Sequence, residues 1–199
     1  MNPIFWIILI LAVLYIWNTN WGRGVIGELQ VRILLRMMLP SGDYFVLHNV
    51  ILPSGQGSTE IDHLIFSRYG IFVIETKNRG GWIYGNQYDK QWTQTFSRYA
   101  KFKFQNPLRQ NYKHTMTVVE KLKVPKEHVH SIVAFNWRAT FKTDMPHNVL
   151  KFHRLPSYVK SHYEQVFSEE ANTNYLNRIE QLRQKGFLAK LGHIWSLRR

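Results

Sequence analysis

The residues of this sequence that are best suited to catalysis lie between Thr59 and Lys77. Asp62 opens one apolar segment, and Glu75 and Lys77 end the next one, with a turn over Ser67–Gly70 between them. Short β-rich runs that flank a glycine-containing turn predict a hairpin. Because side chains alternate between the faces of a strand, Glu75 and Lys77 share a face. Pairing of the two strands then brings Asp62 opposite the Glu75–Lys77 end.

Two carboxylates and one ammonium at the end of a hairpin indicate a hydrolytic metal site. Mg²⁺ prefers oxygen ligands, takes one or two protein carboxylates and keeps several waters. Lys77 beside the ion would orient or deprotonate a water and stabilise charge that builds on a phosphate. The structural alternative is a solvated hairpin end with a cross-strand ion pair, which contributes little stability. Against it, Glu75 and Lys77 end a strongly apolar strand, where charge is costly unless it is paired or used.

The composition limits the possible functions. The chain has 199 residues, enough for one domain with a sizeable core and some additions. It contains no cysteine, which excludes disulfides, zinc–thiolate sites and a cysteine nucleophile. Lysine and arginine number 26 against 13 acidic residues, a net charge of +13. This excess favours a polyanionic partner, either nucleic acid or the anionic face of a membrane.

The N-terminus carries an unbroken apolar run of 14 residues from Ile4 to Trp17. A membrane span takes about 20 residues, and Pro3–Trp21 supplies 19 with tryptophans at its end. The alternatives are a cleaved signal peptide, which normally has a basic start and a small-residue cleavage site, and a buried core helix, which is rarely apolar all round. Arginines follow the run and none precede it, so the positive-inside rule places the N-terminus outside and the remaining chain in the cytoplasm.

Periodicity and turn residues predict the elements that position the hairpin. The expected antiparallel meander of three or four strands lies behind one helix, and the first helix is expected to be largely buried because it is apolar over most of its circumference. Helices are predicted over Val25–Leu39, Pro107–Leu122 and Pro156–Gln184, and strands over Tyr44–Leu52, Glu60–Phe66, Ile71–Lys77, Trp82–Tyr84, Gln91–Thr95 and His130–Phe135.

Glu28, near the start of the first predicted helix, has two interpretations. It is either an i,i+4 partner of Arg32 that also favours the helix dipole, or a further carboxylate directed at the hairpin site.

A basic, aromatic stretch follows the hairpins. Residues 98–160 hold 13 lysines and arginines against three acids, with Tyr99, Phe102, Phe104 and Tyr112 interleaved. Such a surface is typical of a groove that tracks phosphates and stacks bases. The alternative is an ordinary solvated helix face with some attraction to the membrane surface.

Four blocks of residues in this order resemble the PD-(D/E)xK nuclease superfamily and, more narrowly, the nuclease-related domain. One departure from the superfamily pattern is Ile61, where the superfamily name has proline. The resemblance covers about Gly22 to Lys123. The blocks are Gly27–Glu28, Thr59–Leu64, Gly70–Lys77, and Gln105–Pro107 with Gln110.

The resemblance implies an α/β fold of the α+β type with a mixed sheet, built on a restriction-endonuclease-like αβββαβ core. With the features above, it predicts a transmembrane anchor over 1–21, a nuclease-like domain over 22–140 and a basic, mainly helical extension over 141–199.

The same resemblance assigns roles to individual residues. Asp62 and Glu75 are expected to hold Mg²⁺ or Mn²⁺ with the carbonyl of Thr76, and Lys77 to orient the attacking water. Glu28 is expected to hold a metal-bound water or complete the site, and Glu60 is a lesser candidate. The residues expected to contact nucleic acid are Asn106, Gln110, Lys101, Lys103, Arg109 and Lys113.

Together these features predict a membrane-anchored, Mg²⁺-dependent nuclease that hydrolyses phosphodiester bonds of nucleic acid, with DNA favoured and no small-molecule cofactor. One alternative is a membrane-tethered nucleic-acid-binding module that keeps the fold without turnover. The other is a structural membrane protein whose basic surface meets only anionic lipid.

Overall fold

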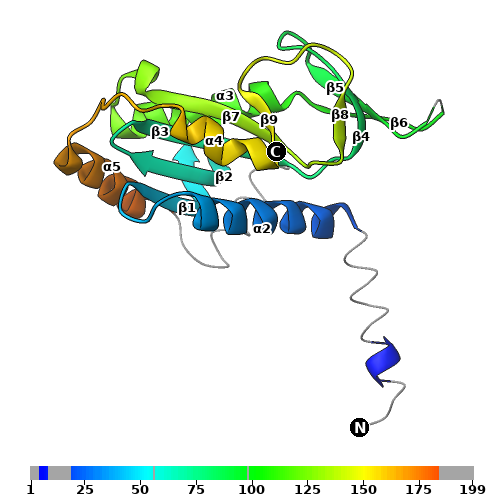
Figure 1. The fold of residues 1–199 in the computed structure, drawn as a ribbon, viewed down its shortest axis with the longest axis horizontal. Coiled ribbons are helices and arrows are strands. Elements are labelled where there is room, and N and C mark those ends of the chain that lie inside the picture. The colour runs from blue at the N-terminus through cyan, green and yellow to red at the C-terminus, as the bar shows by residue number, and fades with distance from the viewer. Residues whose placement is uncertain (1–4, 9–18, 56, 98, 184–199) are drawn as a thin grey trace.

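The computed structural model describes residues 5–8, 19–55, 57–97 and 99–183. The elements are α2 (Asn20–Met38), β1 (Tyr44–Ser54), β2 (Gly57–Ser67), β3 (Gly70–Lys77), β4 (Gly81–Tyr84), β5 (Gln91–Thr95), β6 (Lys101–Gln105), α3 (Pro107–Leu122), β7 (Val129–Phe135), β8 (Ala139–Phe141), β9 (Val149–Lys151), α4 (Leu155–Lys160) and α5 (Glu169–Leu182). From α2 to β7 the helices and strands follow the expected order α-β-β-β-α-β. Three further strands are inserted before the second of these helices (Figure 1).

A mixed five-stranded sheet in the order β1-β2-β3-β7-β9 forms the centre of the fold. The hairpin β2–β3 is antiparallel and turns at Ser67–Gly70, where Gly70 adopts a φ of +140° that a side chain would rarely tolerate. Beyond the hairpin, β3 pairs in parallel with β7, and β7 with β9. Because β3 lies between β2 and β7 and is covered on both faces, its sequence is a nearly continuous apolar run.

Helices cover both faces of this sheet (Figure 1). On one face Leu64 and Val73 pack against α3 and α5, and on the other face Phe72 and Ile74 pack against α2 and α4. Each fully buried aliphatic side chain contributes about 1.5–3 kcal/mol. These two cores hold the end of β3, and with it the candidate site, in a fixed position between α2 and α3.

A second sheet in the order β6-β5-β4-β8 continues from the first one. The neighbouring parallel strands β3 and β7 each run into a strand of this sheet, β4 and β8, which are again parallel to each other. Backbone hydrogen bonds cross the junction, from Asn136 N to Lys77 O at 3.0 Å and from Gly81 N to Arg138 O at 3.0 Å. The two strands therefore leave the first sheet together, directly after Lys77 and Asn136.

Several predicted elements differ from the structure. The expected antiparallel meander is present as the three strands β1-β2-β3. The hairpin β4–β5 does not extend it, because it belongs to the second sheet, and β3 pairs in parallel with β7 instead. The helix predicted over Pro156–Gln184 is two helices, α4 and α5, separated at 161–168. Strands β6, β8 and β9 were not predicted, and β9 joins the central sheet from within the stretch expected to be a mainly helical extension.

Helix α2 is buried along one stripe only, in contrast to the expectation of a largely buried helix. Val31, Leu35 and Leu39 lie one turn apart and are buried against the sheet. Other apolar side chains of the helix remain exposed, because a sheet covers only one side of a helix that lies across it. The exposed ones are Val25, Leu29, Ile33, Met37 and Met38.

The predicted membrane anchor over 1–21 falls largely outside the described residues, namely at positions 1–4 and 9–18. Within the described part of the chain, Phe5–Ile8 form a helical segment with exposed side chains. None of the helices in that part is long and apolar enough to cross a membrane. The anchor stays a prediction.

Gly27 lets α2 approach the end of β3 closely. A Cβ atom at this position would lie 2.5 Å from Cβ of Asn78, the residue that follows β3. That atom is next to the backbone and has little freedom to move, so a side chain at position 27 would push the helix outward. The neighbouring Glu28 would then move with the helix.

We predict that Gly27→Ala lowers the free energy of unfolding by about 1–3 kcal/mol, the usual cost of overpacking. Gly24→Ala in the same helix is the matched control, since nothing lies within 4 Å of a Cβ there. This control should raise stability by up to about 1 kcal/mol, the helix propensity of alanine over glycine. Urea denaturation measures both, and equal stabilisation by the two variants would contradict the close approach at Gly27.

Candidate active site

Asp62 and Glu75 meet where the hairpin strands β2 and β3 stop pairing. The last paired residues are His63 and Ile74, so the two acids are the next residues on each strand. The Oδ2 atom of Asp62 accepts hydrogen bonds from the backbone N of Thr76 at 2.6 Å and from its hydroxyl at 2.7 Å. The expected juxtaposition of Asp62 with the Glu75–Lys77 end is present.

Glu75 is almost fully buried, at 2 % exposure, and interacts with two basic side chains. The ammonium of Lys77 donates a hydrogen bond to Oε1 of Glu75 and another to Oε1 of Gln110, the latter at 3.1 Å. Nε2 of His114 lies 3.2 Å from Oε2 of Glu75, and Nδ1 of the same ring lies 2.6 Å from the hydroxyl of Thr59. Gln110 and His114, one turn apart on α3, thus position the end of β3.

The pKa values of the two carboxylates are shifted in opposite directions. Burial, repulsion from Glu75 and a smaller repulsion from Glu28 hold the pKa of Asp62 well above its usual value, although the bonds from Thr76 oppose this. Burial would raise the pKa of Glu75 as well, but Lys77 and His114 outweigh it and bring that pKa below its usual value. The charge of Glu75 is therefore compensated in the protein, whereas the charged form of Asp62 is disfavoured and has no cation among the causes of its pKa shift.

Glu28 faces the site from α2. It accepts a hydrogen bond of 2.7 Å from the amide of Asn49, and the oxygen of the same amide accepts one of 2.9 Å from Arg32. The acid and Arg32 are thus bridged through Asn49, which has a φ of 51° and lies in β1 opposite Asp62. Repulsion between Glu28 and Asp62 places Glu28 in the electrostatic environment of the site.

Two histidines, His48 of β1 and His63 of β2, form the cross-strand pair next to Asp62. The Nδ1 atoms of His48 and His63 lie 2.7 Å apart. Burial lowers the pKa of His48 to about 4 and that of His63 to about 3, so both rings are neutral at pH 7. The pair therefore adds no positive charge that would offset Asp62.

The residues expected to contact nucleic acid differ in whether their side chains are buried or exposed. Asn106 is fully buried, caps α3 through Leu108 N at 2.9 Å and donates to three backbone oxygens at 86, 87 and 89. Its side chain is used inside the fold and is not available to a nucleic acid, which corrects that expectation. Gln110 accepts a hydrogen bond from Lys77, and its contact with nucleic acid stays a prediction. Four predicted basic residues are exposed: Lys101, Lys103, Arg109 and Lys113.

Three residues of this region were missed by the sequence analysis. His114 continues the row of Asn106 and Gln110 at four-residue spacing, a signal that could have identified it. Asn111, fully buried, donates to Val73 O at 2.9 Å and Ile132 O at 3.0 Å and so joins α3 to both parallel strands. Nothing in the sequence indicates the role of Asn49, which depends on its positive φ.

A pocket of about 480 Å³ opens beside the carboxylates and is lined by Thr76 and Lys77. The donors nearby suit Mg²⁺ in kind: two carboxylates, of which Asp62 lacks a cation and Glu75 Oε2 is buried without a well-aligned hydrogen bond. In the part of the chain that the structure describes, no group of three or more histidine or acidic side chains is arranged as a metal site. An ion here would therefore depend on backbone oxygen and water for its other ligands, which is usual for Mg²⁺.

Comparison with known proteins agrees with this geometry. The model of the nuclease-related domain family matches residues 23–136, from α2 to the end of β7. A curated relative, an uncharacterized protein of Bacillus anthracis, is 36% identical over 159 residues, which are 77% of this chain and 74% of that protein. No solved structure matches. The chain belongs to the nuclease-related domain family.

The unequal compensation of the carboxylates predicts opposite effects of neutralising them. Repulsion between the carboxylates alone would make loss of either charge harmless or stabilising, but Glu75 also contacts Lys77 and His114. Without metal, Asp62→Asn should leave the free energy of unfolding unchanged or higher, because it removes an uncompensated charge. Glu75→Gln should lower it by about 1–3 kcal/mol, because it leaves buried partners without their counter-ion.

Denaturation in EDTA at pH 7 tests this difference. Glu120→Gln on the surface of α3 is the control and should change stability by less than about 0.5 kcal/mol. A loss of stability in Asp62→Asn as large as that in Glu75→Gln would contradict the assignment.

Proposed function

We propose that the protein is a metal-dependent nuclease that hydrolyses phosphodiester bonds of nucleic acid, with DNA as the favoured substrate. The observation that carries this proposal is the end of β3, where Asp62 and Glu75 meet Lys77 beside an open pocket. A buried charge without a counter-ion lowers the stability of the fold. A protein that keeps such a group therefore usually needs it for function. Membership of the nuclease-related domain family supports the same reaction class.

The proposed roles follow from the contacts. Asp62 and Glu75 would hold Mg²⁺ or Mn²⁺, with the backbone carbonyl of Thr76 as a further ligand. When bound, the ion would polarise the scissile phosphate and make a water more acidic. Lys77, held by Glu75 and Gln110 at the pocket, would orient the attacking water and stabilise charge on the phosphate. Glu28 would hold a water of the ion.

The proposal includes a membrane anchor over 1–21, with the N-terminus outside and the nuclease-like domain in the cytoplasm. Its support is the apolar run of Ile4–Trp17 and the arginines that follow it. The four exposed apolar side chains of Phe5–Ile8, which no other described element covers, are consistent with insertion into lipid.

A second candidate is a nucleic-acid-binding module with the nuclease fold and no turnover. The observation that favours it is the contact of Glu75 with both Lys77 and His114, since these basic side chains compete with a metal for the same carboxylate. Metal binding and cleavage therefore have to be measured separately.

We predict that cleavage of DNA by the full chain requires Mg²⁺ or Mn²⁺ and is abolished by EDTA. Asp62→Asn should lose both cleavage and the rise in melting temperature on adding Mg²⁺, because a ligand charge is removed. Lys77→Met should keep the Mg²⁺-dependent rise and lose cleavage by at least about 100-fold, the usual contribution of a catalytic proton-transfer or charge-stabilising group. Lys121→Met, at the far end of α3, is the matched control and should cleave like the wild type.

Two outcomes decide between the candidates. Mg²⁺-dependent stabilisation with no cleavage of single- or double-stranded DNA or RNA would favour the binding module. Wild-type cleavage in EDTA, or full activity of Lys77→Met, would falsify the mechanism.

We predict that the full chain remains in the membrane fraction after washing at high salt, because burial of an apolar segment does not depend on ionic strength whereas attraction to anionic lipid does. Protease added to intact cells should leave a C-terminal tag uncut. Release by salt alone, or cleavage of the tag from outside, would contradict the anchor and its orientation.

A further inference from the structure

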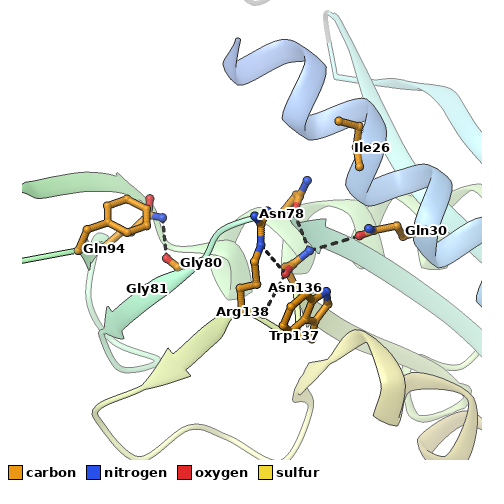
Figure 2. Close-up of a pocket in the computed structure, with 10 residues that line it drawn as sticks. Ile26, Gln30, Asn78, Gly80, Gly81, Gln94, Asn136, Trp137 and Arg138 are labelled. Carbon is orange, nitrogen blue, oxygen red and sulfur yellow. Dashed lines mark hydrogen bonds between the residues drawn. The ribbon is translucent and has the colours of Figure 1, made fainter. Parts of the chain in front are cut away.

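The pocket at the candidate active site continues into a larger one at the junction of the two sheets. The larger pocket has a volume of about 780 Å³ and shares Asn78, Gln94 and Phe96 with the first. The combined space, called the junction groove below, runs from Thr76 and Lys77 at one end to Asn136–Arg138 at the other. Figure 2 shows the latter end, where Gln30 of α2 faces the loop between β7 and β8.

Hydrogen-bonded amides give the junction groove a fixed floor. Asn136, which is buried, donates to Oδ1 of Asn78 at 2.7 Å and to Oε1 of Gln30 at 3.3 Å, and its own oxygen accepts from Arg138 N at 2.9 Å (Figure 2). Gln94 donates to Gly80 O at 2.7 Å. Because the residues on both sides of Trp137 are tied down in this way, the backbone that carries its ring is held in place.

Exposed aromatic rings line the groove above this floor. Trp137 is 64% exposed and Phe96 58% exposed, and both line the groove together with Gly80 and Gly81. Gly81 has a φ of +76°, and the ring of Phe96 packs against it. A Cβ atom at position 81 would lie only 2.9 Å from that ring, so a residue without a side chain is needed here. Large rings held on a rigid, solvent-open surface are typical of stacking platforms for a planar ligand.

The charge of the groove suits a polyanion. Arg79, Lys103 and Arg138 line it along with Lys77, and none of the described residues that line it is acidic. Arg79 is fixed by its hydrogen bond of 2.8 Å to Gln94 and by its position 4.3 Å over the ring of Phe104. Phosphates of one strand would thus meet cations at intervals between Lys77 and Arg138.

We propose that the junction groove binds single-stranded nucleic acid, with phosphates along the cations and an unpaired base stacked on Trp137. In a duplex the faces of the bases are covered by their neighbours, so an aromatic platform can bind only an unpaired base. The proposal deepens the proposed function, on which its link to cleavage rests: a strand in this groove passes Lys77, whose ammonium contacts Glu75 of the candidate site.

Binding to two oligomers of equal charge tests the stacking. The full chain is titrated in EDTA, where cleavage cannot interfere, into a short labelled oligothymidylate and into an abasic strand of the same length, and fluorescence anisotropy gives the Kd. The wild type should prefer the strand with bases by roughly 5- to 150-fold, the value of one to a few stacked bases. Trp137→Ala should lose most of this preference and Trp137→Phe should keep it.

Matched variants separate stacking from charge. Trp82→Ala removes another exposed tryptophan of the second sheet that does not line the groove, and it should keep the preference for bases. Arg138→Gln should leave the preference intact but reduce the salt dependence of binding, by about 0.7 in the slope of log K against log salt for each phosphate that the protein no longer neutralises. Trp137→Ala should leave that slope unchanged.

The outcomes for the groove and for the nuclease are distinguishable. Equal binding of the two oligomers by the wild type, or an undiminished preference in Trp137→Ala, overturns the groove, whether or not the same preparation cleaves DNA with Mg²⁺. If the protein prefers the strand with bases through Trp137 but does not cleave DNA, the proposed groove is supported and the proposed nuclease activity is rejected.

Discussion

The buried carboxylate of Glu75 is the constraint on which the candidate site depends. A charge at the end of a strand that is covered on both faces is tolerated only when cations and donors surround it. Lys77 supplies one cation from the same strand, and α3 supplies Gln110 and His114. The ring of His114 is held in turn by Thr59 of β2. The charge therefore fixes how α3 lies against the hairpin, and Asn111 on the same helix secures this arrangement through β3 and β7.

Strands β3 and β7 leave the central sheet side by side, and the bend that they form provides space for a ligand. Ligands of sheets with parallel strands bind beyond the carboxyl ends of those strands. Here both ends run on into a second sheet, and α2 reaches the bend because Gly27 leaves room for Asn78. The carboxylates, Lys77 and the amide floor around Asn136 thus gather at one bend although they come from four segments of the chain.

Local patterns were sufficient to predict the hairpin, α3 and most strands, because their signals lie within a few residues. Pro107 after Asn106 marks the start of α3, and the alternation around Gly70 marks the turn. Contacts between distant segments were not predictable in this way. The exposed stripe of α2, the break between α4 and α5 and the second sheet all depend on which face another element covers.

The same distinction applies to the site. Asp62, Glu75 and Lys77 were predicted from their spacing, whereas the compensation of Glu75 depends on Lys77 together with His114, which lies 39 positions beyond Glu75. Asn106 shows the reverse error: a residue in a recognisable block was expected to contact nucleic acid, and its amide is used inside the fold. A pattern identifies which residues are unusual, and only the packing shows what each one contacts.

The distribution of charge gives the strongest physical reason for a metal-dependent reaction. The chain carries a net charge of +13, which attracts a nucleic acid from a distance, and cations line the groove that leads to the site. At the site itself carboxylates gather: Lys77 is paired with Glu75, while burial, Glu75 and Glu28 raise the pKa of Asp62. A phosphate that arrived there would be repelled unless a cation lay between it and these carboxylates. Long-range attraction combined with local repulsion would suit the proposed reaction, in which a bound divalent ion lies between the phosphate and the carboxylates.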